Sequence, residues 1–172
     1  MRLVYRTRQF WRALHAKPGK EELALIQQAL SPPLLVLFLR MQASEQAHSF
    51  RVFHRLLQQG EKHPDLLAAA LLHDVGKSLH PLRLWERVMI VLGKHFFPEQ
   101  ANLWGQGGPS GLQRAFVVSN QHPRWGAEMA KQAGASPVTV RLIERHQDPA
   151  PPKPANLEDQ LLFQLQLSDN ES

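Results

Sequence analysis

The chain has 172 residues, a length that suits one domain with a core of its own. It contains no cysteine, so disulfides and thiolate metal ligands are excluded, and its apolar run at 34–39 is far shorter than the roughly 20 residues of a membrane-spanning helix. The formal net charge of +5 favours an anionic partner: a phosphorylated metabolite, nucleic acid or an anionic membrane surface. Nucleic acid is the weakest of these because the basic residues accompany no recognisable binding motif. We expect a soluble, cytoplasmic protein.

The first half of the chain is predicted to be helical. Its apolar residues recur at helical spacing and do not alternate as they would in a strand, so we expect an all-α fold. The predicted helices span 3–15, 20–30, 34–40, 44–60, 65–73 and 82–95. The helix at 3–15 would be basic and amphipathic, and the helix at 65–73, rich in Leu and Ala, would be largely buried.

The second half begins with a segment rich in glycine and proline, residues 98–111. Such a composition predicts a loop, either a plain surface loop or a lid over a site. An extended, proline-rich crossing is predicted at 148–156, and the remaining segments are predicted to be helices at 111–119, 123–133, 136–146 and 157–169. We expect residues 1–43 to form a helical extension that packs on a domain made of residues 44–172.

His73 and Asp74 are adjacent at the end of an apolar run, residues 66–72. A carboxylate in such a setting is costly unless it is paired or bound to a cation. Gly76 follows, and it would let the backbone turn sharply and place the pair at a helix end. An ordinary helix C-terminus, with His near its negative end, would show the same residues.

Other potential metal ligands are spread over the remaining helices. Each of them lies on a different predicted helix or at its edge, and a helical bundle can bring such residues to one interior point. Imidazole together with carboxylate suits Fe, Mn, Co, Ni or Zn. The candidates are His48, His122, which would stand at a helix start, His146 and Asp169.

The order of these residues resembles the HD-domain superfamily of metal-dependent phosphohydrolases. The resemblance rests on His48, followed by Leu72-His73-Asp74-Val75-Gly76-Lys77 and then by the distant Asp169. His122-Pro123-x-x-Gly126-Ala127 and Ile143-x-x-His146 are similar to the two-metal, His-Asp-x-Gly-Lys subgroup. The resemblance covers roughly residues 44–172 and implies a single-domain helical bundle.

The resemblance also implies a ligand set and a cofactor of one or two divalent transition metals. The first metal would be held by His48, His73, Asp74 and Asp169. Asp74 would bridge to a second metal held by His122 and His146, a role that needs a carboxylate because a neutral imidazole offers one lone pair. Many two-metal members carry a further His directly after the position of His146, where this chain has Gln147.

Two basic residues are candidates for substrate binding. Lys77 follows Asp74 by three residues, so it can reach the same face and bind a substrate anion, or it can be a solvated lysine at a helix end. Arg51 follows His48 by three residues and would hold a phosphate or pair with a carboxylate of the site. We assign catalytic roles to Asp74 and Lys77.

The function that this set implies is hydrolysis of a phosphomonoester or phosphodiester by a metal-activated water. The substrate would be a phosphorylated small molecule, of nucleotide or cyclic dinucleotide type. Two alternatives stay open: an HD-fold diiron oxygenase, which has a similar ligand order, and a non-catalytic HD-fold module that senses a nucleotide. The sequence predicts no oligomeric state.

Overall fold

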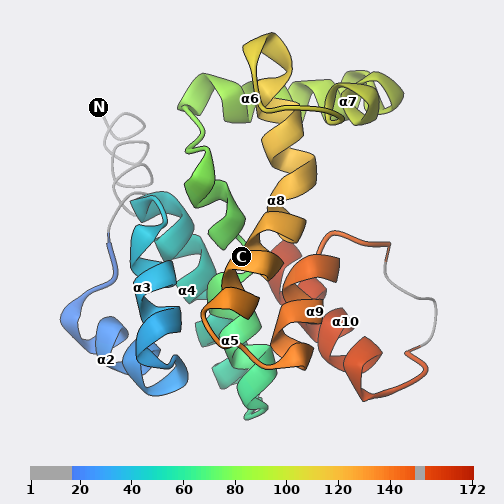
Figure 1. Cartoon of the computed structure of the whole chain (residues 1–172). Coiled ribbons are helices and arrows are strands. Elements are labelled where there is room, and N and C mark those ends of the chain that lie inside the picture. The colour runs from blue at the N-terminus through green and yellow to red at the C-terminus, as the bar shows by residue number, and fades with distance from the viewer. Residues whose placement is uncertain (1–16, 150–153) are drawn as a thin grey trace, which may run out of the picture.

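The computed structural model describes residues 17–149 and 154–172. Over these ranges the protein is helical and has no β-strand, as predicted. The predicted helix 3–15 and part of the predicted crossing at 148–156 lie outside the described residues. The elements, shown in Figure 1, are α2 Lys20–Ala29, α3 Pro32–Arg40, α4 Ala43–Gln58, α5 Pro64–Leu72, the 3₁₀-helix η1 Val75–Leu79, α6 Leu84–Phe96, α7 Pro98–Trp104, the 3₁₀-helix η2 Gly111–Gln113, α8 Arg114–Gln132, α9 Pro137–Arg145 and α10 Leu157–Asn170.

Several helices begin at a proline, which explains how a proline-rich chain stays helical. The first turn of a helix leaves its N–H groups unbonded, so proline costs nothing there and its fixed φ suits the helix. The helices of this kind are α3, α5, α7 and α9. In α9 the Ser136 side chain also accepts a hydrogen bond from the Thr139 N–H, and Asn156 caps α10 in the same way.

Helix α5 is the central element of the core. Leu66, Leu71 and Leu72 are fully buried, which confirms the expectation for this segment. Helices α4, α9 and α10 pack around it, and α2 and α3 contact it as well (Figure 1). Because α5 is buried, residues 73 and 74 at its C-terminal end lie in the interior of the molecule.

Helices α2 and α3, the described part of the segment before residue 44, pack on the same body as the rest. Helix α2 contacts α3 and α5, and α3 contacts η1, α5 and α8. The boundary at residue 43 stays a prediction. No helix in the described part of the chain is long and apolar enough to cross a membrane.

Two predictions about the second half of the chain are wrong, the first of them in part. Of the predicted loop at 98–111, residues 98–104 instead form α7, which begins at Pro98 and packs on α6 and α8, while residues 105–110 are irregular as predicted. The predicted helices 111–119 and 123–133 are one helix, α8, with Pro123 inside it and His122 in the middle rather than at a start. Proline removes one helical hydrogen bond, and the packing of α8 against η1 and α9 keeps the helix continuous.

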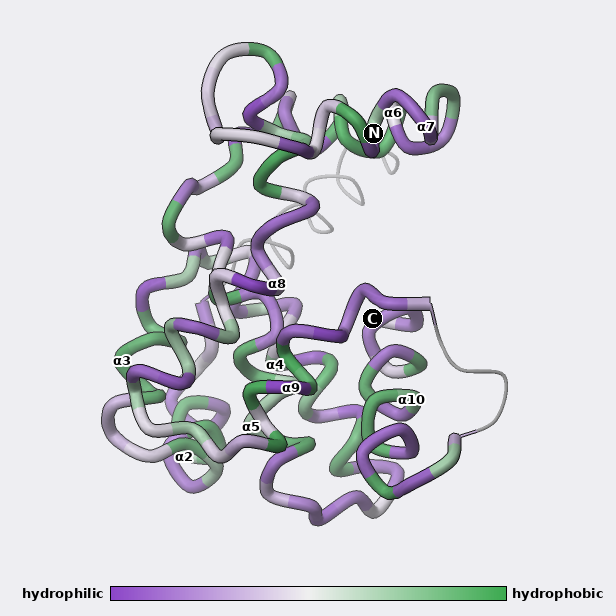
Figure 2. Tube along the Cα trace, turned by 45° about the vertical axis from the view of Figure 1, so that its right-hand side comes forward, coloured by the Kyte–Doolittle hydropathy of each residue, from purple (hydrophilic) through white to green (hydrophobic). Residues whose placement is uncertain are grey.

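Helices α6 and α7 lie at one end of α8, away from α5, α9 and α10 (Figure 1). A small apolar cluster holds α6 on α8, and Gly93 of α6 sits directly against the Phe116 ring. Figure 2 shows apolar residues along both helices at this end of the molecule. The cluster consists of Leu82, Ala115 and Val118, with Met89, Ile90 and Trp125 packed against them.

Candidate metal centre

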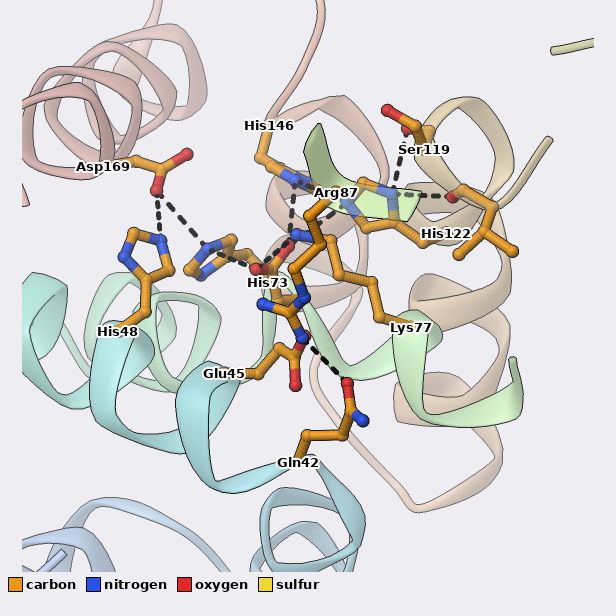
Figure 3. A network of polar contacts seen from close by, with 12 residues as sticks. Gln42, Glu45, His48, His73, Lys77, Arg87, Ser119, His122, His146 and Asp169 are labelled. Carbon is orange, nitrogen blue, oxygen red and sulfur yellow. Dashed lines mark hydrogen bonds and ion pairs between the residues drawn. The ribbon is translucent and has the colours of Figure 1, made fainter. Parts of the chain in front are cut away.

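The structure brings all six predicted ligands together at the point where α4, α5, α8, α9 and α10 meet (Figure 3). They form two groups, and within each group three ligand atoms lie within 4.8 Å of one another. The first group has His48 of α4, His73 at the end of α5 and Asp169 of α10; the second has Asp74, His122 of α8 and His146 at the end of α9.

The first group is centred on the Asp169 carboxylate. Its Oδ1 lies 2.7 Å from Nε2 of His48 and 3.5 Å from Nε2 of His73. The other ring nitrogen of His73, Nδ1, donates to the carbonyl of Ala70 (3.0 Å), so Nε2 presents a lone pair to the group. That Nε2 is buried and has no hydrogen-bond partner. A buried polar atom is rarely left unpaired, and a metal ion at this point would satisfy it.

The second group is fully buried and equally well oriented. Nε2 of His122 lies 3.2 Å from Oδ1 of Asp74, Nε2 of His146 lies 4.0 Å from the same oxygen, and the two ring nitrogens are 3.3 Å apart. Both rings donate Nδ1–H to backbone carbonyls, which leaves both Nε2 lone pairs facing Asp74. Such outer hydrogen bonds fix the tautomer and the orientation of a metal-binding imidazole. The carbonyls belong to Val118 and Ser119 for His122, and to Ile143 for His146.

Asp74 stands between the two groups and faces both. Its Oδ1 points to the second group, while its Oδ2 lies 3.8 Å from Nε2 of His73. Oδ2 also accepts a hydrogen bond from Nζ of Lys77 at 2.6 Å. A single carboxylate with one oxygen directed at each group has the geometry needed to bridge two ions.

Charge at the centre favours metal binding. Burial opposes ionisation of Asp74, but Lys77 and His73 outweigh it and hold the pKa of this carboxyl well below its ordinary value. Burial, with His73 and His122, lowers the pKa of His146 to about 3, so this ring stays neutral. The pKa of His122 is also lowered, chiefly by burial. These are the protonation states that metal ligands require.

His73 is the exception. Burial lowers its pKa, but the carboxylates of Asp74 and Asp169 raise it further, so the net shift is upward. A metal ion would therefore compete with a proton for this ring more than for His122 or His146.

Gly76 holds the two halves of the centre together. A Cβ atom there would overlap the carbonyl oxygen of His122 and come within 2.7 Å of the Gly126 nitrogen. The backbones of η1 and α8 are therefore in direct contact, and this contact fixes Asp74 beside His122. The predicted placement of His73 and Asp74 at a helix end is confirmed, but Gly76 has no positive φ, so close packing rather than backbone freedom requires glycine there.

Pro123 assists the orientation of His122. A residue with an N–H at position 123 would donate it to the carbonyl of Ser119, one helical turn earlier. Proline has no N–H, and the Nδ1–H of His122 donates to that carbonyl at 3.0 Å instead. The interruption in α8 thus supplies the acceptor that orients a candidate ligand.

We expect Pro123→Ala to lower the affinity of the second group for a metal by about tenfold, because the new N–H competes with the imidazole for Ser119. The stability of the fold should not fall, since alanine suits a helix interior better than proline. Metal titration and thermal unfolding measure the two effects. Unchanged affinity in a normally folded variant would show that the Val118 carbonyl alone orients the ring.

Arg51 does not join the centre through any contact the structure shows. Its Nε donates to the backbone carbonyl of Ser172 at 3.4 Å. It also lines a separate hollow between α2 and α4, together with Glu21, Glu22 and His54.

A half-buried ion pair beside the centre was not anticipated from the sequence. Glu45 of α4 pairs with Arg87 of α6, which also donates to Oε1 of Gln42 at 2.8 Å (Figure 3). Burial raises the pKa of Glu45, although Arg87 and Lys77 oppose this. Glu45 precedes His48 by three residues, so helical spacing could have indicated its position. Nothing in the sequence pairs it with Arg87, which a different helix provides.

A hollow of about 430 Å³ opens onto the centre, with His146 and Asp169 in its wall. Phe163 and Leu167 of α10 form an apolar part of this wall. A neighbouring hollow of about 530 Å³ shares Lys94, Gln147 and Asp148 with the first. Gln147, the departure from the two-metal pattern, thus lines the cleft and is not among the grouped ligand atoms.

Lys94 of α6 is a second residue that sequence reasoning missed. It lines both hollows, and burial together with the nearby Lys77 lowers its pKa. Among the described residues it forms no ion pair. A cation without a protein partner at the mouth of the centre is available to a substrate anion.

Comparison with known families agrees with this geometry. The model of the HD domain family matches residues 46–170, well over half of the chain, and the protein therefore belongs to the HD domain family. Members of this family bind divalent metals and are mostly metal-dependent hydrolases. Searches of curated proteins and of solved structures found no match.

Proposed function

We propose that the protein is a metal-dependent phosphohydrolase of the two-metal type within the HD family. The observation that carries the proposal is the position of Asp74, whose two oxygens face separate groups of ligand atoms. The proposed ligands are His48, His73 and Asp169 for one ion and His122 and His146 for the other, with Asp74 shared.

The cofactor would be one or two divalent transition metals, chosen from Fe, Mn, Co, Ni and Zn by the mixed nitrogen and oxygen ligands. Such ions lower the pKa of a bound water and stabilise charge that develops on phosphate oxygens. The chain's own contribution is to hold Asp74 ionised through Lys77 and to keep His122 and His146 neutral with Nε2 facing Asp74. The deep burial of His73, His122 and Asp74 limits the access of bulk water.

The proposed substrate is a phosphomonoester or phosphodiester of nucleotide or cyclic dinucleotide type. Its phosphate would lie at the end of the cleft where His146 and Asp169 are exposed to the hollow. Its organic part would contact Phe163 and Leu167, which supply an aromatic and an aliphatic surface. Lys94 and Lys77 would pair with phosphate oxygens as point charges.

Hydrolysis by the metal-loaded protein tests the proposal. Protein loaded with Mn²⁺ or Fe²⁺ should release nitrophenol from a nitrophenyl phosphate ester and should cleave at least one mononucleotide or cyclic dinucleotide. No turnover of any of these would reject it. Oxygen uptake by the ferrous protein without phosphate release would assign the centre to the oxygenase class, and absence of stoichiometric metal would indicate a sensor.

Lys94→Ala should raise KM for a phosphate ester about tenfold, the loss expected for one charge-assisted contact, while kcat changes by less than about twofold. Lys131→Ala is the matched control, because Lys131 is an exposed lysine that lines a different hollow. Steady-state kinetics on both variants decide the matter. An unchanged KM in Lys94→Ala would remove this residue from the substrate site.

A further inference from the structure

The outer side of α6 and α7 carries an unusual number of exposed apolar side chains. Between residues 84 and 103, eight large apolar residues are 50–66 % exposed. Single exposed apolar residues are normal on a protein surface, whereas a set of this size on two successive helices indicates an interaction site. We call this set the α6–α7 apolar surface; it consists of Leu84, Trp85, Val88, Val91, Leu92, Phe96, Phe97 and Leu103.

Helix α6 has three distinct sides, which explains why this set cannot turn inward. One side, with Glu86 and Gly93, is buried on α8. A second side carries Arg87 and Lys94, seven residues apart and hence aligned, and it faces the metal centre and its cleft. The exposed apolar residues of α6 occupy the third side, at spacings of three, four and one that place them on one stripe.

The charges along α6 indicate what would cover this surface. The one acidic residue of the helix, Glu86, is buried and paired with Arg114. Of the other charged residues of α6 and its N-cap, Arg83 and Lys94 form no ion pair among the described residues, whereas Arg87 is paired with Glu45 of α4. The exposed Glu99 at the start of α7 is the one acidic residue between the apolar side chains of the two helices. The whole chain carries a net charge of +5. A second copy of the chain would bring two sets of these unpaired cations, Arg83 and Lys94, together, whereas an anionic lipid surface would neutralise them while burying the apolar side chains.

We propose that the α6–α7 apolar surface docks on an anionic membrane, with α6 lying in the plane of the interface. A helix that combines Trp, Phe and Leu on one side with basic residues at the margin binds membranes in this way, through apolar burial and attraction to anionic lipids. Trp85, Phe96 and Phe97 would lie at the level of the headgroups, where aromatic side chains are favoured. The inference is independent of the proposed catalytic function.

Co-sedimentation with vesicles tests the inference on the full chain. The protein should bind vesicles of equal parts phosphatidylglycerol and phosphatidylcholine, bind pure phosphatidylcholine more weakly, and lose affinity as salt is raised. Val88→Asp should weaken binding to the mixed vesicles by at least about tenfold, because it removes a valine that the membrane would bury and adds a charge that anionic lipids repel. Far-UV circular dichroism and metal content should match the wild type.

Val36→Asp is the matched control, since Val36 of α3 is 51 % exposed and Val88 is 50 % exposed. It should leave vesicle binding unchanged. Absence of binding to anionic vesicles, or an equal loss in both variants, would overturn the inference. A concentration-dependent dimer that Val88→Asp dissociates, without vesicle binding, would overturn it as well and assign the surface to a second copy.

Discussion

Asp74→Asn is expected to reduce turnover by more than about a hundredfold and to weaken both metals. Loss of a residue that merely orients a ligand costs roughly 10- to 100-fold in affinity or activity, and Asp74 faces both ligand groups directly. The amide keeps the size of the side chain but loses the charge and one acceptor oxygen. Nζ of Lys77, 2.6 Å from Oδ2, would then lack its counterion at the centre.

Metal analysis after dialysis and turnover of a phosphate ester measure this effect together. Asp148→Asn is the control, because Asp148 lines the same hollow but is exposed and pairs with Arg145 at 3.7 Å. It should retain metal and activity, and both variants should keep the helical circular dichroism signal. Two metals per chain and full turnover in Asp74→Asn would refute the bridging role.

Gly76→Ala is expected to destabilise the fold by about 3 kcal/mol or more and to abolish metal binding at the second group. Overpacking a core typically costs about 1–3 kcal/mol, and here the new methyl group meets backbone atoms of His122 and Gly126, which cannot rotate away. Relief requires η1 and α8 to separate, which moves Asp74 from His122. Chemical denaturation and metal titration report the two losses.

Alanine variants of two other glycines serve as comparisons for the stability loss expected in Gly76→Ala. A Cβ at Gly126 would lie 3.1–3.3 Å from its nearest neighbours, so Gly126→Ala should cost less than Gly76→Ala. Gly108 has open space around it and no positive φ, so Gly108→Ala should leave stability and metal binding unchanged. Equal stability of the Gly76 and Gly108 variants would mean that the contact between η1 and α8 is not tight.

The candidate centre could be predicted from the sequence because its signals are local. His73 and Asp74 follow a continuous apolar run. Because that run forms the buried helix α5, the pair lies at the buried end of this helix. Resemblance to the HD family then supplied the distant partners, and the structure brings them together. Their roles as ligands stay a prediction until metal is measured.

The features that were missed depend on packing between distant segments. Proline usually breaks a helix pattern, and only the packing of α8 on η1 and α9 shows that Pro123 lies inside one. Helix α6 is apolar on two sides, so its sequence could not indicate which side packs on α8. The side of α6 that packs on α8 determines that Arg87 and Lys94 lie beside the centre, so their positions could not be predicted from the sequence either.

Titration of metal-free protein with Mn²⁺, followed by release of nitrophenol from a phosphate ester, tests the central claim most directly. The dinuclear centre predicts no hydrolysis without metal, activity that rises with added ion, and saturation at two equivalents per chain. Full hydrolysis by the metal-free protein, or none at any loading, would contradict the claim.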